Sequence, residues 1–165
     1  MYKIIAYLNF LFSSTNQHGV HSPFVYDYVT KCLYARQKFK VSKAENVLFK
    51  SMGYFNVKNI WISSGSKPLQ KKIQAEHPSI QINHGPYDLI FIDAPHLEES
   101  FNFLFENIHN NSMLLIGSIY KNKPCTKLWQ MVKDHEKARV TIDMYHCGAV
   151  FFRKEQASEH FRIRI

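Results

Sequence analysis

Two apolar segments near the end of the chain constrain its fold more than any other feature. Residues 140–145 (VTIDMY) and 148–153 (GAVFFR) both have the pattern of strands, and only His146 and Cys147 separate them. Parallel strands need a crossover of about a dozen residues, so this short connection requires an antiparallel hairpin. The sheet is therefore predicted to end in two antiparallel strands.

The segments before the hairpin alternate between strand and helix patterns. Short apolar runs predict buried strands at residues 59–62, 87–93 and 112–116, and helical apolar spacing follows each of them at residues 66–76, 101–108 and 124–135. This β-α-β-α-β order implies a parallel sheet with helices on both faces. The predicted fold is a Rossmann-like α/β domain with a mostly parallel sheet and a C-terminal antiparallel hairpin.

The first third of the chain is predicted to be helical. Ser22 and Pro23 supply an N-cap and a first-turn proline for one helix, and a capping box from Ser42 to Glu45 begins another. We find no linker or repeat in the 165 residues, which fit one domain. We expect a helical segment over residues 1–56 and an α/β core over residues 57–165.

An apolar stripe marks a helix at the start of the chain. Residues 1–12 are too short to cross a bilayer, which needs about 20 apolar residues, and Asn9 interrupts them. The stripe consists of Ile4, Ile5, Leu8, Leu11 and Phe12. It predicts a surface helix packed on the protein through this face, and a helix lying on a membrane surface is the alternative. We expect no membrane partner.

Charge and cysteine content exclude some classes of protein. The net charge is +8, but lysine and arginine are spread along the chain and form no dense basic run. This distribution favours a solvated surface, and we expect no nucleic-acid partner, although folding could gather the charges on one face. The three cysteines are far apart in sequence, which favours the cytoplasm over an oxidising compartment.

Three motifs, together with the order of elements, carry a resemblance to a known family. They are Asn-x-His-Gly-x-His-Ser-Pro-Phe at residues 16–24, Ile-Asp-x-x-His at 92–96, and Val-Phe-Phe-Arg-Lys-Glu-Gln-Ala at 150–157, followed by His160 and Phe161. On these residues the chain resembles a bacterial group of class I S-adenosylmethionine-dependent methyltransferases. The resemblance spans nearly the whole chain except its middle.

The resemblance implies a set of site residues. The cofactor-binding candidates are Ser63, Ser64, Gly65, Ser66 and Asp93. Asp93 and His96 are the catalytic candidates, since ligands bind at the carboxyl ends of parallel strands and a histidine can accept a proton from a substrate. The alternative is structural, with Asp93 capping the next helix and His96 in a surface turn. His18 and His21 are expected to help shape a substrate pocket.

The middle of the chain departs from the family pattern. The resemblance implies an acid at the end of the first strand and another at the end of the second, where Asn83 and His84 stand instead. Gly85-Pro86 is too short to return between two parallel strands. Residues 79–85 are therefore expected to form a loop or an antiparallel edge, or else the chain goes almost directly from the first strand to Tyr87. One βα unit is then deleted, and it is the unit that would hold adenosine. No metal is expected, because Asp93 and His96 lack a third ligand.

Three functions are compatible with these observations. The chain is either a methyltransferase-like protein with an eroded S-adenosylmethionine site and weak or no activity, or a non-catalytic module on the same scaffold. A pseudoenzyme of the second kind would bind a protein partner at the edge uncovered by the deleted unit. A basic nucleic-acid-binding protein on this fold is a third hypothesis. The sequence does not specify the methyl acceptor or the oligomeric state.

Overall fold

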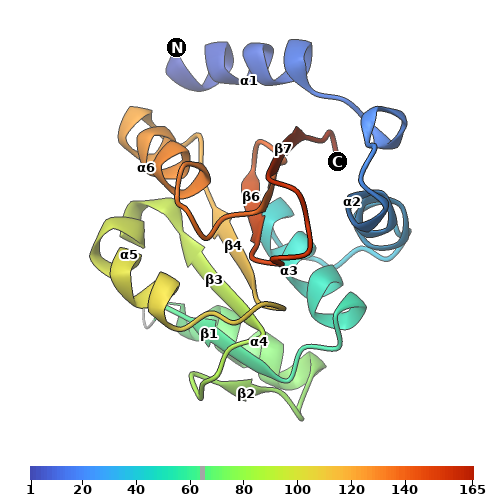
Figure 1. Ribbon diagram of the computed structural model, residues 1–165. Helices are drawn as coiled ribbons and strands as arrows, with labels where there is room; N and C mark the ends of the chain where they lie inside the picture. The colour runs from blue at the N-terminus through green and yellow to red at the C-terminus, as the bar shows by residue number, and fades with distance from the viewer. Residues whose placement is uncertain (64–65) are drawn as a thin grey trace.

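A computed structural model describes residues 1–63 and 66–165 of the chain (Figure 1). Its helices are α1 (Tyr2–Ser13), η1 (Gln17–Gly19), α2 (Pro23–Asp27), η2 (Tyr28–Leu33), α3 (Lys43–Tyr54), α4 (Lys67–Glu76), η3 (Ala94–His96), α5 (Leu97–Glu106) and α6 (Lys123–Lys133). Its strands are β1 (Asn59–Ile62), β2 (Gln81–Ile82), β3 (Leu89–Asp93), β4 (Met113–Gly117), β5 (Val140–Asp143), β6 (Cys147–Phe151) and β7 (Glu159–Arg162).

Within the described residues the strands form one seven-stranded sheet in the order β2-β1-β3-β4-β6-β5-β7. Strands β2, β1, β3 and β4 are parallel, whereas β6 runs antiparallel to both of its neighbours, β4 and β5. The last strand, β7, pairs in parallel with β5 at the edge. The predicted Rossmann-like sheet with its antiparallel hairpin is confirmed.

The alternation of side chains along β3 divides the core into two layers. Leu89 and Phe91 join the cluster under η2, α3 and α4, and Ile90 and Ile92 join the cluster under α5 and α6. Successive residues of a strand point to opposite faces, so a strand buried on both faces is apolar throughout. Helices cover both faces of the sheet, as predicted (Figure 1).

Local capping explains where the early helices begin. The Ser22 hydroxyl accepts a hydrogen bond from Val25 N at the start of α2. At α3 the Ser42 hydroxyl accepts from Glu45 N at 3.2 Å, and the Glu45 carboxylate accepts from Ser42 N at 3.0 Å. These bonds satisfy backbone groups that a helix start leaves without partners, and they confirm both predicted starts.

Residues 79–85 do not form the expected loop or antiparallel edge. Instead β2 lies parallel to β1, and Ile60 of β1 pairs with both Ile82 and Leu89. Because β2 ends at the level where β3 begins, the chain has only to cross from one side of β1 to the other. Asp88 fixes this crossing, since its carboxylate accepts hydrogen bonds from Lys58 N and Asn59 N at 2.9 Å. No return along the strand direction is needed, which is why six residues suffice.

The first helix also differs from its prediction. The side chains of Ile4, Leu8 and Phe12, expected to pack on the protein, are 65%, 47% and 89% exposed. Phe10 is instead the buried residue of α1. The helix packs through the opposite side because the aromatic rings of Tyr2 and Phe10 reach the body of the protein. None of the described helices is both long and apolar enough to cross a membrane.

Candidate functional site

A cavity of about 530 Å³ lies at the carboxyl end of β3, between the first turns of α3 and α4. It is lined by Ser42, Lys43, Ala44, Glu45, Ser66, Pro68, Leu69, Phe91, Asp93, Ser118 and His146. This volume lies within the range of small-molecule sites, and the carboxyl edge of a parallel sheet is where such ligands bind. The cavity is therefore the candidate site.

Asp93 is the acidic residue that β3 delivers to this cavity. Its carboxylate accepts a hydrogen bond from Ser118 Oγ at 3.1 Å, and it makes no capping bond to η3. Gly117 is its partner across the β3–β4 register, and a Cβ at that position would collide with Asp93 Oδ1. The glycine therefore permits the close approach that holds the Asp93 carboxylate beside Ser118.

His146 is a lining residue that sequence analysis did not select. It sits in the turn of the β5–β6 hairpin, and its carbonyl accepts a hydrogen bond from Ser118 N at 2.9 Å. Burial lowers the pKa of His146, and the nearby positive charge of Lys43 lowers it further. The imidazole is thus neutral near pH 7 and able to accept a proton. The predicted hairpin could have identified His146 as a candidate. Because β6 pairs antiparallel to β4, the hairpin turn lies at the edge of the sheet where the parallel strands have their carboxyl ends.

The charges around the cavity have both signs. The first turns of α3 and α4 line the cavity, which places the positive ends of two helix dipoles beside it, and Lys43 adds a positive charge. Asp93 and Glu45 contribute carboxylates, of which the Glu45 group is already engaged by Ser42 N. A site with this distribution suits a small zwitterionic ligand.

The structure separates the predicted site residues. Ser66 and Asp93 line the cavity, whereas His96 is exposed at the start of α5 and is not among the lining residues. Ser63 follows β1, is half-buried and also lies outside the lining. Ser64 and Gly65 lie outside the described residues. The pairing of Asp93 with His96 in catalysis stays a prediction.

His18 and His21 are both exposed, on a segment that runs beside β7. Thr15 forms a parallel bridge with Ile163 just beyond β7, and the Ser22 hydroxyl donates to Gln156 Oε1 at 3.5 Å. Neither histidine is among the residues that line the cavity. Their assignment to substrate binding stays a prediction.

The end of β2 shows what replaces the acid implied there. Asn83 has a left-handed backbone (φ 61°), and its Oδ1 accepts a hydrogen bond from Ile62 N at 2.9 Å. The side chain thus serves to terminate β1. His84 is exposed. The position at which the family resemblance implies an acid therefore carries no carboxylate.

Within residues 1–63 and 66–165, no group of three or more histidine, cysteine, aspartate or glutamate side chains is arranged to hold a metal ion.

Comparison with known proteins gives one structural likeness. No family model and no curated protein matches the chain. The fold is similar to the crystal structure of a Staphylococcus aureus protein provisionally assigned as a caffeoyl-CoA O-methyltransferase, with 12% identity and a TM-score of 0.48. The match covers 83% of this chain and 94% of that one. A likeness at this level does not establish a family, so function has to be argued from the site.

Proposed function

We propose that this protein is methyltransferase-like and binds S-adenosylmethionine weakly, in the cavity at the carboxyl end of β3. The observation that carries the proposal is the position of the Asp93 carboxylate, held by Ser118 in a cavity that two helix N-termini face. The Rossmann-like strand order and the resemblance of the chain's motifs to class I methyltransferases support the choice of ligand.

The lining residues would hold the amino-acid end of the ligand. Lys43 and the N–H groups of the first turn of α4 suit its carboxylate, and Asp93 suits its positive charges. When bound, S-adenosylmethionine supplies an electrophilic methyl group. His146, neutral near pH 7, is placed to accept the proton that an acceptor hydroxyl or amine would lose.

Binding is expected to be weak because the described part of the site has no carboxylate for the ribose hydroxyls of the ligand. A carboxylate on the ribose hydroxyls would make charge-assisted hydrogen bonds worth about 1.5–3 kcal/mol each. Asn83 has no such carboxylate, and its oxygen is already engaged by Ile62 N. We therefore expect a dissociation constant of about 0.1–1 mM, at the weak end of the usual range for enzyme ligands.

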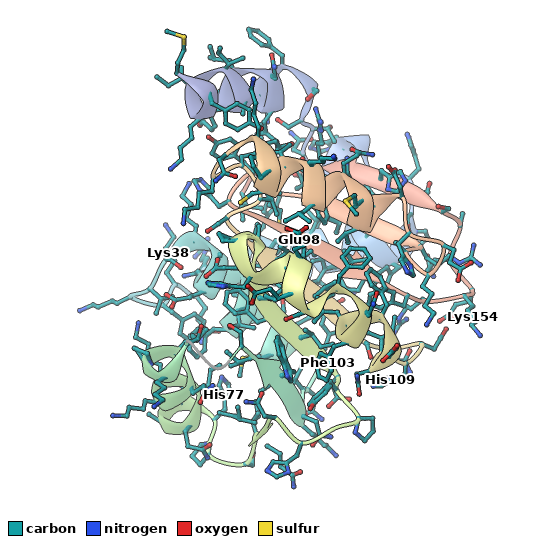
Figure 2. The ribbon with its side chains drawn as sticks, turned by 90° about the vertical axis from the view of Figure 1, so that its left-hand side faces the viewer. Lys38, His77, Glu98, Phe103, His109 and Lys154 are labelled. Atoms are coloured by element: carbon teal, nitrogen blue, oxygen red, sulfur yellow. The ribbon has the colours of Figure 1, made fainter. Side chains whose placement is uncertain are left out.

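Thermal unfolding in the presence of S-adenosylmethionine or S-adenosylhomocysteine tests the proposal. Ligand at about ten times its dissociation constant stabilises the fold by about 1.4 kcal/mol, or about 3–5 °C for a chain of this size. Asp93→Asn should remove most of this shift. Glu98→Gln is the matched control, because Glu98 is an exposed carboxylate on α5 and not among the cavity lining (Figure 2). An equal shift in both variants would contradict the assigned site.

The alternative, a non-catalytic module on this scaffold, is distinguished by the same titration. It requires that neither compound shifts the unfolding temperature at about 5 mM. A titration without any shift would not affect the assignment of the fold, but it would remove the basis for proposing methyl transfer.

A further inference from the structure

The outward side of α1 is apolar, which is the reverse of an ordinary surface helix. Six of the ten large apolar side chains that are exposed among the described residues belong to residues 1–12: Met1, Ile4, Ile5, Tyr7, Leu8 and Phe12. Ile4, Leu8 and Phe12 recur at helical spacing on the side opposite Phe10. Exposed apolar patches of this kind mark interaction sites in soluble proteins.

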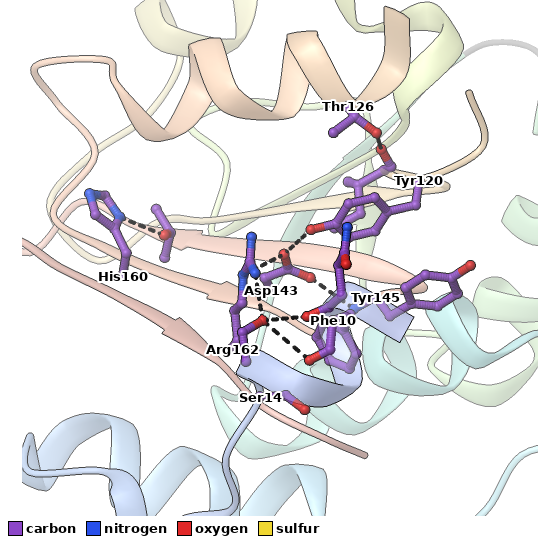
Figure 3. Close-up of polar contacts among 12 residues, drawn as sticks. Phe10, Ser14, Tyr120, Thr126, Asp143, Tyr145, His160 and Arg162 are labelled. Carbon is purple, nitrogen blue, oxygen red and sulfur yellow. Dashed lines mark hydrogen bonds and ion pairs between the residues drawn. The ribbon is translucent and has the colours of Figure 1, made fainter. Parts of the chain in front are cut away.

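Contacts on the inner side fix the helix in this orientation. Tyr2 Oη donates to Thr126 Oγ1 of α6 at 2.7 Å, and Arg162 Nη1 of β7 donates to Ser13 Oγ at 2.6 Å. Phe10 is 3% exposed, and its ring lies 5.7 Å from that of Tyr145 (Figure 3). The helix is therefore tied at both ends, and rolling its apolar side inward would break these contacts.

The surroundings of the helix are positively charged. Residues 1–26 contain no aspartate or glutamate, and the whole chain carries a net charge of +8. Lys3 of α1 and the exposed Lys121 line one hollow beside the helix. Lys133 and Arg162 line another, where Arg162 also pairs with the buried carboxylate of Asp143 at 3.7 Å. None of the described residues lining these two hollows is acidic. The partner of the apolar side is thus expected to be negatively charged at its surface.

The size of the apolar side argues against a protein partner held by this helix alone. Twelve helical residues are about 18 Å long and about 10 Å wide, which gives a footprint near 200 Å². A stable protein interface buries about 800 Å² on each partner. A bilayer does not need such an area, because each inserted apolar side chain adds to partitioning and nearby lysines add attraction to anionic headgroups.

We propose that α1 docks the protein on the surface of a bilayer that contains anionic lipids. Ile4, Leu8 and Phe12 insert at the boundary of headgroups and acyl chains, and the net positive charge of the chain attracts it to anionic headgroups. The helix lies in the plane of the membrane along the outer edge of the molecule, where Figures 1 and 2 both show it. This docking does not depend on ligand binding in the cavity.

Co-sedimentation with vesicles tests the proposal. The chain should bind phosphatidylcholine vesicles containing about 30% phosphatidylglycerol, and bind pure phosphatidylcholine much more weakly. Each of Leu8→Gln and Phe12→Gln should weaken binding about five- to tenfold, so the double variant should bind about 25- to 100-fold more weakly. Met131→Gln is the matched control, because Met131 is 47% exposed on α6 and should leave binding unchanged.

Fluorescence adds a readout at the helix itself. The two native tryptophans, half-buried Trp61 on β1 and buried Trp129 on α6, give a constant background. A Phe12→Trp side chain should shift its emission to the blue when anionic vesicles are added. The wild-type spectrum should not change.

Three outcomes would overturn the proposal. They are no binding of the wild type at millimolar lipid, equal binding of the double variant, and no emission shift in Phe12→Trp. Sedimentation velocity in the same buffer tests whether a second copy of the chain, rather than a bilayer, covers the apolar side of α1. A dimer that the double variant dissociates, without vesicle binding, would assign the apolar side of α1 to a second copy of the chain.

Discussion

Replacing Gly148 by alanine should destabilise the protein through a single collision in its core. Gly148 lies in β6, and the ring of Trp129 from α6 packs directly on it. A Cβ built at Gly148 would lie 2.6–2.8 Å from three atoms of that ring. Separations below 3 Å require one group to move, and the Trp129 side chain is packed in the core at 1% exposure.

The expected magnitude follows from this geometry. Inserting a methyl group into a close-packed core costs about 1–3 kcal/mol, and a rigid, buried indole places Gly148→Ala near the upper end. For a chain of this size about 2–3 kcal/mol lowers the unfolding temperature by about 5–10 °C. Gly53→Ala is the matched control, since a Cβ at Gly53 in α3 meets nothing within 4 Å. It should raise the free energy of unfolding by about 0.5–1 kcal/mol, because alanine is the better helix former.

A double-mutant cycle with Trp129→Phe assigns the cost to the ring. The three atoms that the new Cβ would meet belong to the outer part of the indole, which phenylalanine lacks. The two substitutions together should destabilise by at least about 1 kcal/mol less than the sum of their separate effects, in urea unfolding at fixed pH. The packing of α6 on β6 would be refuted if the Gly148→Ala variant had the same free energy of unfolding as the wild type. It would also be refuted if the effects of the two substitutions were strictly additive.

Three further predictions concern polar and thiol groups. Tyr120→Phe removes the hydroxyl that donates to Asp143 Oδ2 at 2.5 Å (Figure 3) and should cost about 1–3 kcal/mol in urea unfolding, because the buried carboxylate loses a donor; an unchanged midpoint would contradict this contact. The lowered pKa of His146 means that the unfolded chain binds its proton more readily, so the free energy of unfolding should fall as pH drops below about 6.5. His146→Gln should make that decline shallower, and an identical pH profile would count against the burial of this ring. Burial raises the pKa of the Cys32 thiol to about 12, and all three cysteines are buried, so a thiol reagent should label the native protein only at its rate of opening.

The sheet could be predicted because its signals are local. An unbroken apolar run such as Leu89–Asp93 identifies a strand buried on both faces, and the two-residue turn at His146 leaves only one way to pair its strands. Capping residues such as Ser42 likewise act within one turn of helix. These signals need no knowledge of distant contacts.

The errors arose where register or packing direction decides the outcome. By length alone the connection between β2 and β3 is too short for parallel strands, because the sequence does not show that Ile82 and Leu89 stand at the same level beside Ile60. For α1 the apolar stripe predicted the packing side. The stripe gives the face of a helix but not whether that face meets the protein, and the contacts of Tyr2 and Phe10 decided otherwise.

The candidate site was predicted in part. Asp93 was identified from its place at the end of a buried strand, whereas His146 was missed because the turn that carries it was used only to assign the hairpin. The cavity also depends on the first turn of α3, which comes from a segment about 50 residues earlier than Asp93. Such a meeting of distant segments requires the tertiary structure.

Calorimetric titration with S-adenosylmethionine tests the central claim most directly, since it measures affinity and stoichiometry without a known acceptor. We expect one site per chain with a dissociation constant of about 0.1–1 mM, weakened at least about tenfold by Asp93→Asn and unchanged by Glu98→Gln. No heat of binding at about 5 mM ligand, or binding that Asp93→Asn leaves intact, would contradict it.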